Sequence, residues 1–170
     1  ITGSKGKTTT SLLIHSILNA HGRNCAYIGS NGVIINGQTY ETANTTPESH
    51  ELHRLFRIMA DGGVKYVVLE VSSQALWMGR IRGLVFDSVL FLNLSRDHIG
   101  GVEHPDFEHY RDCKRLLFTD YPAKMAVVNR GDGNSRYMVE GVAAPVLDFG
   151  LCEPDAVDKP MWSASGVRPM

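Results

Sequence analysis

The chain has 170 residues, 43% of them hydrophobic, which is enough apolar material for one compact core and fits the usual size of a single domain. Lysine and arginine number 17 against 18 aspartate and glutamate residues, so the net charge of -1 leaves no general positive excess to hold a nucleic acid or an anionic membrane. The longest apolar runs, such as 66–69 and 89–92, are far shorter than the roughly 20 residues of a membrane-spanning helix. We therefore expect a protein that binds no nucleic acid and does not insert into a membrane.

The cysteines indicate a reducing compartment. Cys25, Cys113 and Cys152 are odd in number and widely spread, with neither the spacing of a metal site nor the density of a secreted disulfide scaffold. We therefore expect the protein to work in the cytoplasm. The first residue is Ile1, and a glycine-rich motif follows almost at once with no signal region before it. This pattern predicts a fragment of a longer protein.

Hydrophobic periodicity predicts a helix, a strand and a hairpin in the first part of the chain. The helix covers 7–20 and is expected to be amphipathic. Its apolar residues, which recur at helical spacing, are Leu13, Ile14, Ile17 and Leu18. A short strand over 25–28 follows, and Asn36-Gly37 between two apolar runs predicts a tight β-hairpin.

The rest of the chain alternates strands and helices. Thr46-Pro47 is expected to open a helix, with Thr46 as its cap and Pro47 in its first turn. The runs over 66–71 and 88–92 are almost continuously apolar, which is typical of parallel strands covered on both faces. Later elements are a helix marked by Phe107, Tyr110, Leu116 and Leu117, a strand over 125–128, and a strand closed by Asp148-Phe149. The alternation predicts an α/β fold with a doubly wound, mostly parallel sheet. No usable period is found over 161–170.

The motif Gly3-Ser4-Lys5-Gly6-Lys7-Thr8-Thr9 stands directly before the first helix. Successive backbone N–H groups of such a loop, together with the helix N-terminus, surround phosphate oxygens, while Lys7 neutralises charge and Thr8 offers a hydroxyl to Mg²⁺. A flexible glycine turn is the plainer interpretation, because two residues separate the glycines where the common Walker pattern has about four. The position before a helix favours nucleotide binding. Only Ile1-Thr2 represents the strand that should feed the loop, so we expect that strand to be truncated.

Polar residues follow two of the apolar runs. Glu70, Ser72 and Ser73 come after the first run, and Asn93, Asp97 and His98 come after the second. Ligands of open α/β sheets bind at the carboxyl ends of the strands, so these side chains are candidates for a metal and substrate site. A surface glutamate at a strand end and a histidine with no chemical role are the structural alternatives.

Five motifs in order give the chain a family resemblance. They are Thr2-Gly3-Ser4-Lys5-Gly6-Lys7-Thr8-Thr9, Asn44-Thr45-Thr46-Pro47, Glu70-Val71-Ser72-Ser73, Asn93-Leu94-Ser95-Arg96-Asp97-His98 and Lys114-Arg115-Leu116-Leu117-Phe118. Together they resemble the ATP-dependent Mur ligases of peptidoglycan synthesis, in particular the UDP-N-acetylmuramoyl-tripeptide synthetase type. The resemblance implies that 1–170 is the P-loop NTPase-like central domain. It also implies that an N-terminal UDP-binding domain and a C-terminal amino-acid domain lie outside the chain.

The resemblance also implies roles for individual residues. The ATP-binding positions are Gly3, Ser4, Lys5, Gly6, Lys7, Thr8, Thr9, Asn93 and Asn129. The catalytic positions are Lys7, Glu70, His98 and Lys114. The Mg²⁺ ligands are Thr8, Glu70, His98 and Lys114, the lysine as a carbamate formed with CO₂. The groove for the UDP-MurNAc-peptide is lined by Thr45, Thr46, Ser72, Ser73 and Arg80.

The chain departs from the family pattern at three places. Gln74 stands where a histidine usually follows the two serines, and the stretch 99–104 is longer than usual. The segment after Asn129 lacks the paired acids often found there. Without the resemblance, Lys114 would be interpreted as an exposed helix lysine. These departures lie around the substrate groove and the metal loop, so they bear on substrate choice more than on ATP use.

The activity implied by the resemblance is ATP-dependent addition of an amino acid to UDP-MurNAc-dipeptide through an acyl phosphate. Two alternatives stay open. One is another ligase of the same superfamily, such as folylpolyglutamate synthase or a ligase for a different Mur step. The other is a nucleotide-binding module or structural remnant without catalysis, in which His98 and Lys114 would have no evident chemical role.

Overall fold

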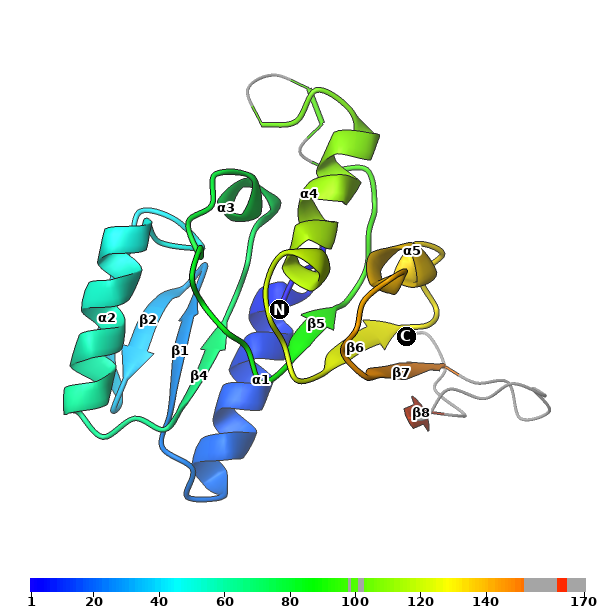
Figure 1. The fold of residues 1–170 in the computed structure, drawn as a ribbon. Helices are drawn as coiled ribbons and strands as arrows, with labels where there is room; N and C mark the ends of the chain where they lie inside the picture. Colours follow the sequence, from blue (N-terminus) through cyan, green and yellow to red (C-terminus); the bar gives the residue numbers. More distant parts are fainter. Residues whose placement is uncertain (98, 101–102, 152–161, 165–170) are drawn as a thin grey trace.

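The computed structural model describes residues 1–97, 99–100, 103–151 and 162–164 (Figure 1). The helices are α1 (Lys7–Ala20), α2 (Ser49–Asp61), α3 (Ser73–Trp77), α4 (Phe107–Thr119) and α5 (Ser135–Val139). The strands are β1 (Cys25–Gly29), β2 (Gly32–Ile35), β3 (Gln38–Tyr40), β4 (Tyr66–Leu69), β5 (Val89–Phe91), β6 (Ala126–Asn129), β7 (Val146–Leu151) and β8 (Trp162–Ala164). No helix in the described part of the chain is long and apolar enough to cross a membrane.

Two four-stranded sheets are joined by the first two residues of the chain. One sheet has the order β3-β2-β1-β4 and the other β5-β6-β7-β8. Ile1 bonds to the β4 side, where its nitrogen donates to the Leu69 carbonyl at 2.8 Å. Thr2 pairs in parallel with Phe91 of β5, and its N–H donates to Leu90 at 2.8 Å. Ile1-Thr2 therefore occupies the centre of one continuous sheet.

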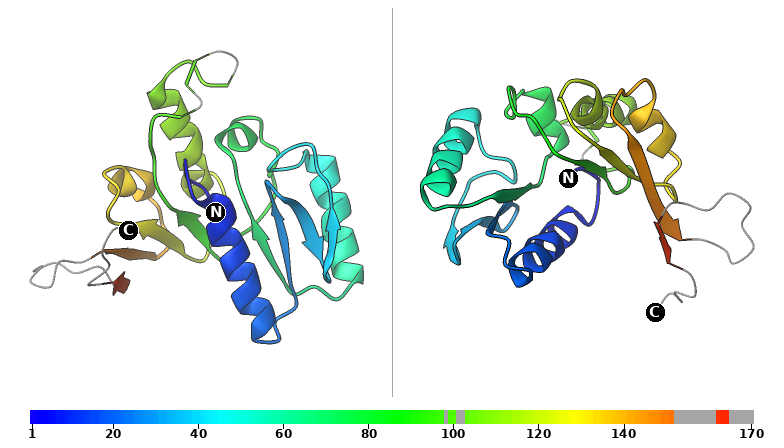
Figure 2. Two further views of the ribbon diagram at one scale, coloured as in Figure 1. Left: turned by 180° about the vertical axis from the view of Figure 1, so that it is seen from behind. Right: turned by 60° about the horizontal axis from the view of Figure 1, so that its bottom comes forward.

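The sheet is mostly parallel and carries helices on both faces, as the sequence predicted. β1 pairs in parallel with β4, and β5, β6, β7 and β8 are parallel neighbours. Among the described strands, antiparallel pairing occurs only at β2, which pairs with β1 on one side and with β3 on the other. In the right-hand view of Figure 2, α1 lies alone on one face while α2, α3, α4 and α5 cover the other. This is the doubly wound α/β arrangement.

The hydrophobic core lies between the sheet and the helices of the more heavily covered face. Its helical members include Leu52, Leu55 and Met59 of α2 with Tyr110 and Leu117 of α4. Among the described residues, no side chain of α1 belongs to this cluster. The core therefore fixes α4 against the sheet.

The hairpin prediction is confirmed. β2 and β3 pair with Ile35 opposite Gln38, leaving only Asn36 and Gly37 in the turn. Both turn residues have positive φ, 50° and 79°. Two left-handed residues in a row define the turn type whose twist suits a two-residue hairpin, and Asn-Gly is the pair that adopts it most readily.

Two details of the predicted helices are wrong. α2 begins at Ser49 and is preceded by Glu48, while the Thr46 hydroxyl donates to the carbonyl of Glu70 instead of capping the helix. In α1, Leu13 and Ile17 are more than half exposed, and the one fully buried side chain is Ser11. Ile14 and Leu18 are half-buried, so the apolar face of this helix is only partly covered.

Lys114 corrects the interpretation made without the family, because it is only 1% exposed. Three elements were also missed, namely α3, α5 and β8. Each is only three to five residues long, which is too short for a helical or strand period to emerge. The first half of β4 is exposed as well, at Tyr66 and Val67, so this strand is covered on both faces only towards its carboxyl end.

Candidate functional site

The glycine-rich motif forms a loop between the central strand and α1. Gly6 precedes α1 with φ at 81°, a left-handed conformation that favours glycine. A Cβ on Gly3 would lie 3.0 Å from the Cβ of Leu92 and 3.3 Å from the backbone nitrogen of Asn93. Both glycines are therefore required by the backbone. The first N–H groups of α1 have no preceding turn to donate to, so they are available to an anion.

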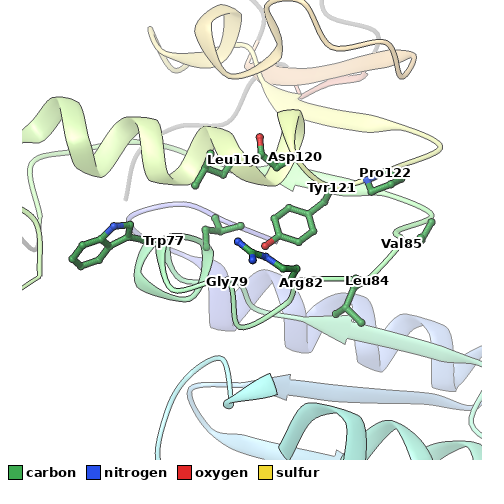
Figure 3. A pocket seen from close by; sticks show the side chains of 11 residues that line it. Trp77, Gly79, Arg82, Leu84, Val85, Leu116, Asp120, Tyr121 and Pro122 are labelled. Atoms are coloured by element: carbon green, nitrogen blue, oxygen red, sulfur yellow. The ribbon is translucent and has the colours of Figure 1, made fainter. Parts of the chain in front are cut away.

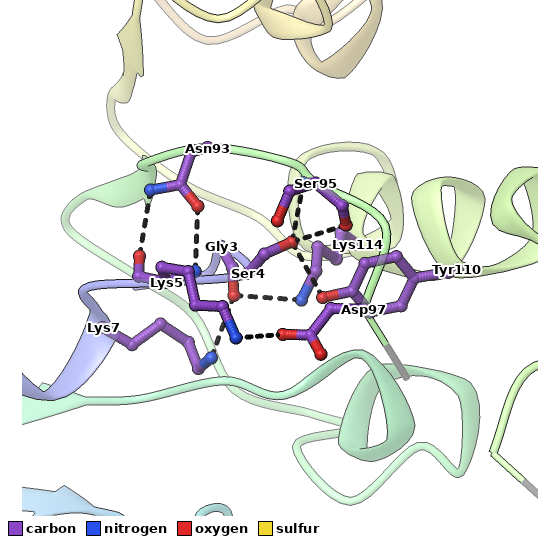
Figure 4. A network of polar contacts seen from close by, with 9 residues as sticks. All are labelled: Gly3, Ser4, Lys5, Lys7, Asn93, Ser95, Asp97, Tyr110 and Lys114. Atoms are coloured by element: carbon purple, nitrogen blue, oxygen red, sulfur yellow. Dashed lines mark hydrogen bonds and ion pairs between the residues drawn. The ribbon is translucent and has the colours of Figure 1, made fainter. Parts of the chain in front are cut away.

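The loop is held in place by the segment after β5. The Asn93 side-chain amide accepts from Lys5 N–H at 2.9 Å and donates to the Lys5 carbonyl at 3.0 Å. The Ser4 hydroxyl lies 3.0 Å from the hydroxyl of Tyr110 and accepts from Ser95 N–H at the same distance. Figure 4 shows these bonds bringing the loop, the end of β5 and α4 together. In this structure Asn93 positions the loop by binding its backbone.

Lys5 forms an ion pair within the same network. Its Nζ lies 2.7 Å from a carboxylate oxygen of Asp97, and its side chain is 73% exposed. Solvent screens an exposed pair of this kind, so it adds little to folding stability. It does hold Asp97 beside the phosphate loop.

Glu70 is fully buried and its carboxylate is surrounded by donors. Oε1 accepts from the Tyr27 hydroxyl at 2.5 Å and from Ser30 N–H at 3.2 Å. Oε2 accepts from the Thr8 hydroxyl at 3.0 Å and from the Ser30 hydroxyl at 3.4 Å. The two predicted Mg²⁺ ligands of the loop and β4, Thr8 and Glu70, thus lie in contact.

The space for this carboxylate is provided by a glycine. A Cβ on Gly29 would lie 2.1 Å from Glu70 Oε1 and 2.3 Å from the Tyr27 hydroxyl. Burial, and then the hydrogen bond to Glu70, raise the pKa of Tyr27 far above its usual range. The phenol therefore stays protonated and is the donor in its hydrogen bond with Glu70. Gly29 and Tyr27 therefore determine where the carboxylate lies.

Two lysines from different elements meet at one backbone oxygen. Lys7 Nζ from the start of α1 donates to the Gly3 carbonyl at 2.9 Å, and Lys114 Nζ from α4 donates to it at 3.2 Å (Figure 4). Lys114 Nζ also lies 4.5 Å from the centre of the Tyr110 ring. Lys114 therefore points from α4 towards the glycine-rich loop.

Burial changes the proton affinity of both lysines. Two effects together lower the pKa of Lys114 to about 7. The larger is desolvation by burial, and the second is the neighbouring positive charge of Lys7. Desolvation also lowers the pKa of Lys7, against the opposing attraction of Glu70. A substantial fraction of Lys114 is therefore a neutral amine near pH 7, which is the nucleophilic form.

A cleft of about 260 Å³ opens beside the lysines. It is lined by Lys7, Ala43, Asn44, Thr45, Ser72, Ser73, Gln74, Arg80, Glu103, Tyr110 and Lys114. The cleft brings four of the five predicted substrate residues next to both lysines. Thr46, the fifth, is buried beneath it, donates to the carbonyl of Glu70 at 2.9 Å and accepts from Ser72 N–H at 3.1 Å. Thr46 therefore fixes the backbone of Ser72, which lines the cleft.

Arg80 is nearly buried and already engaged on one side. Its Nε lies 2.8 Å from Glu48 Oε1, close enough for an ion pair although the N–H is not directed at the oxygen. One terminal nitrogen donates to the Thr46 carbonyl at 3.3 Å. Arg80 therefore contributes a guanidinium group to the cleft wall, and Glu48, the residue before α2, holds that group in position.

A second pocket, of about 380 Å³, is larger but lies elsewhere (Figure 3). Its wall consists of Leu76, Trp77, Gly79, Arg82, Gly83, Leu84, Val85, Leu116, Asp120, Tyr121 and Pro122. None of these is a predicted site residue. The chemistry of the smaller cleft, with two lysines and a buried carboxylate nearby, makes it the candidate active site.

The structure does not place two of the predicted site residues, His98 and Asn129, at the cleft. His98 lies outside the described residues. The Asn129 amide donates to the Leu92 carbonyl at 2.8 Å and accepts from Gly131 N–H at 3.0 Å, which fixes the ends of β5 and β6. A contact of Asn129 with adenine stays a prediction.

Several residues around the site had no signal in the sequence. Tyr27 and Ser30 hold the carboxylate of Glu70, and Tyr110 holds the phosphate loop. Tyr27 lies inside a buried strand and Tyr110 inside an apolar helix stripe, where a tyrosine is ordinarily a core residue. Ser72 lines the cleft, and its hydroxyl also caps α3 by accepting from Ala75 N–H at 3.1 Å.

The family model for the Mur ligase middle domain matches residues 1–165. The chain belongs to the Mur ligase middle domain family. It is 48% identical to the UDP-N-acetylmuramyl-tripeptide synthetase of Bifidobacterium longum (strain NCC 2705), with 96% of this chain and 33% of that protein covered. It is 39% identical to the UDP-N-acetylmuramoyl-L-alanyl-D-glutamate--2,6-diaminopimelate ligase of Geobacillus thermodenitrificans (strain NG80-2), over 90% of this chain and 32% of that protein.

A solved structure agrees with these relatives. It is titled as a UDP-N-acetylmuramoyl-L-alanyl-D-glutamate--2,6-diaminopimelate ligase and superimposes with a TM-score of 0.80 at 30% identity. The superposition covers 91% of this chain and 32% of that structure. The Mur ligase middle domain described here therefore spans about a third of the length of the curated relatives it matches.

Proposed function

We propose that this middle domain is the ATP and Mg²⁺ centre of a ligase that adds an amino acid to UDP-MurNAc-dipeptide. The observation that carries the proposal is the contact between Thr8 and Glu70, together with the cleft that Lys7 and Lys114 line. Both lysines donate to the Gly3 carbonyl of the glycine-rich loop. The relatives named as diaminopimelate ligase and tripeptide synthetase support the substrate class. Flanking UDP-binding and amino-acid domains, a cytoplasmic location and the lack of a nucleic-acid partner belong to the same proposal.

The donor set fits Mg²⁺. The ion prefers hard oxygen ligands and is usually bound by one or two carboxylates together with substrate phosphates. Glu70 offers a buried carboxylate whose oxygens already accept four hydrogen bonds, one of them from the Thr8 hydroxyl. Thr8 and Glu70 would hold the first ion, and His98 would contribute to a second. Bound Mg²⁺ would neutralise phosphate charge during phosphoryl transfer.

The loop and Lys7 fit the phosphates of ATP. The first N–H groups of α1 have no preceding helical turn to donate to, and Lys7 joins the loop to the cleft by donating to Gly3 and lining the cleft. On binding, Lys7 would exchange the Gly3 carbonyl for phosphate oxygens, which are stronger acceptors for an ammonium. The positions Gly3, Ser4, Lys5, Gly6, Thr8 and Thr9 would form the cradle, with Asn93 fixing its backbone.

Lys114 fits the carbamate hypothesis. An ammonium would repel Mg²⁺, whereas a neutral amine attacks CO₂, loses one proton and becomes an anionic carbamate. Burial supplies the neutral amine, because the pKa of Lys114 is lowered to about 7. Lys7 lies beside it and would stabilise the negative charge once formed. Carbamylation therefore requires no further residue.

The ligation follows from these positions. The terminal carboxylate of the dipeptide, held near Thr45, Ser73 and Arg80 in the cleft, attacks the γ-phosphorus of ATP and displaces ADP. The amine of the incoming amino acid then attacks the acyl carbon, phosphate leaves with the transferred oxygen, and the amine gives up a proton. Lys7 offsets the repulsion between the two anions in the first step.

Variants of Glu70 and Lys114 in the complete gene product test this proposal. We expect Glu70→Gln to retain the fold and to lose most ATP-dependent ligation of an amino acid to UDP-MurNAc-dipeptide. We expect Lys114→Ala to lose activity and to regain part of it with a short carboxylic acid, while CO₂-depleted parent protein is reactivated by bicarbonate. Full ligation activity in Glu70→Gln would refute the metal site, and a fully active Lys114→Ala would refute the carbamate.

A further inference from the structure

Three side chains with nitrogen and sulfur ligand atoms meet outside the Mg²⁺ donor set. His104, His109 and Cys113 each offer one ligand atom, and these atoms lie within 4.8 Å of one another. His109 and Cys113 are four residues apart on α4 and so share a helix face, while His104 comes from the segment before the helix. His104 and Cys113 are buried. The sequence did not indicate this cluster, because the cysteine spacings alone show no metal motif.

We propose that His104, His109 and Cys113 bind one Zn²⁺ ion. Nothing in this proposal depends on the ligase activity. Imidazole and thiolate favour zinc over magnesium, so the site is chemically different from the oxygen ligands of Glu70 and Thr8.

The distances between the ligand atoms suit a tetrahedral ion. Bond lengths of about 2.0–2.1 Å for nitrogen and 2.3 Å for sulfur place two nitrogens about 3.3 Å apart and a nitrogen and a sulfur about 3.6 Å apart. His109 Nδ1 lies 3.7 Å from Cys113 Sγ, and the Nδ1 atoms of His104 and His109 are 2.9 Å apart. Metal binding would lengthen the second distance by about 0.4 Å. The His109 ring would also turn, because its Nε2 lies 3.8 Å from the same sulfur.

The surroundings of the cluster are those of a metal site. His104 Nε2 lies 2.8 Å from the hydroxyl of Ser73. If Nδ1 binds the ion, Nε2 carries the proton and must donate to Ser73, which is the outer hydrogen bond that orients a metal-bound histidine. The Trp77 ring lies edge-on to His109 at 5.2 Å between ring centres and 6.3 Å from that of His104, so one side of the site is apolar.

Zinc would connect two parts of the cleft. Ser73 lines the cleft, and Cys113 directly precedes Lys114 on α4. An ion bound to His104 and Cys113 would tie the loop before α4 to the turn that carries Lys114. It would also fix Ser73 as an acceptor towards His104, leaving the serine proton to point elsewhere. We therefore assign the ion a role in positioning the cleft.

Cobalt titration of the complete gene product, without a histidine tag and after chelator treatment, tests the site. We expect one equivalent of Co²⁺ to produce a thiolate-to-metal charge-transfer band that Zn²⁺ abolishes and excess Mg²⁺ does not. Cys113→Ser should lose the band, and His109→Ala should weaken Co²⁺ binding at least about tenfold. The controls are Cys25→Ser, a buried cysteine outside the cluster, and the exposed His53→Ala, and both should keep the parental band.

A second readout leaves the ligands intact. Co²⁺ is paramagnetic and should quench the fluorescence of Trp77, which lies against His109. Trp77→Phe should therefore keep the absorption band while losing the Co²⁺-dependent quenching, even if a ligand variant fails to fold. The proposal is overturned if the parent shows no band, if the band survives in Cys113→Ser, or if Trp77→Phe is quenched as strongly as the parent.

Discussion

Replacing Lys114 with methionine should remove a pH-dependent contribution to folding stability. The lysine is 1% exposed and its pKa is lowered to about 7 by burial, against 10.5 for the free side chain. Between these two values the unfolded chain holds a proton that the folded chain has released. Stability must therefore rise with pH in this window, and below about pH 7 the cost of burying the ammonium is present in full.

The size of the effect follows from the same values. Each pH unit in the window is worth at most about 1.4 kcal/mol, and the slope is half of that at the folded-state pKa. The unfolding free energy of the parent should therefore gain about 2 kcal/mol between pH 7 and pH 9 relative to Lys114→Met. Methionine has a similar length and no charge, so it preserves the packing.

Urea unfolding of the 170-residue chain in CO₂-free buffer measures this difference. Lys124→Met is the matched control, because Lys124 is exposed and its pKa is raised by Asp87, so it stays protonated throughout the window. We expect its curve to run parallel to that of the parent. If the unfolding free energy of Lys114→Met also rose with pH as much as that of the parent, burial would not neutralise Lys114. The chemical basis for its carbamylation would then be wrong.

Three further predictions concern the phosphate and metal site. Lys7→Ala should weaken Mg-ATP binding roughly 10- to 100-fold, which is the value of one charge-assisted hydrogen bond. In calorimetric titration the control Lys65→Ala, at an exposed lysine, should bind Mg-ATP as the parent does. Equal affinities for Lys7→Ala and the parent would contradict the role of Lys7. Gly29→Ala should cost about 1–3 kcal/mol of stability and displace Glu70, since the new Cβ would lie 2.1 Å from Oε1. The control in thermal melts is Gly133→Ala, where a Cβ meets no atom within 4 Å. Identical melting temperatures for the two variants would show that Gly29 is not crowded by Glu70. Tyr27→Phe removes the donor 2.5 Å from Glu70 and should alter the Mg²⁺ concentration that half-saturates ATP binding, which an unchanged Mg²⁺ titration would contradict.

The sequence was sufficient for the parts of the fold that repeat or turn in a characteristic way. Asn36-Gly37 specifies its hairpin locally, and the glycine motif before α1 specifies its loop, because both depend on backbone conformations available to few residues. Thr46 was misassigned because a threonine before a proline suits a helix cap as well as a hydrogen bond to a neighbouring strand. The choice depends on Glu70, a residue 24 positions away.

The site was predictable to a similar extent. Glu70 could be found because it follows an apolar run, at the strand edge where ligands of open α/β sheets bind. Tyr27, which holds its carboxylate, has the pattern of an ordinary core residue. Lys114 was assigned only through the resemblance, since its burial results from packing α4 on the phosphate loop. The cluster of His104, His109 and Cys113 depends on how the loop before α4 folds back, which no local pattern reveals.

The central claim is that this Mur ligase middle domain supports ATP-driven activation of a carboxylate, and an oxygen-transfer experiment tests it most directly. The complete gene product would be incubated with ATP, Mg²⁺, the amino acid and UDP-MurNAc-dipeptide whose terminal carboxylate carries a heavy oxygen isotope. We expect one labelled oxygen in the released phosphate for each amide bond formed, and little labelled phosphate from Glu70→Gln. Amide formation with unlabelled phosphate, or phosphate release that does not depend on the dipeptide, would contradict it.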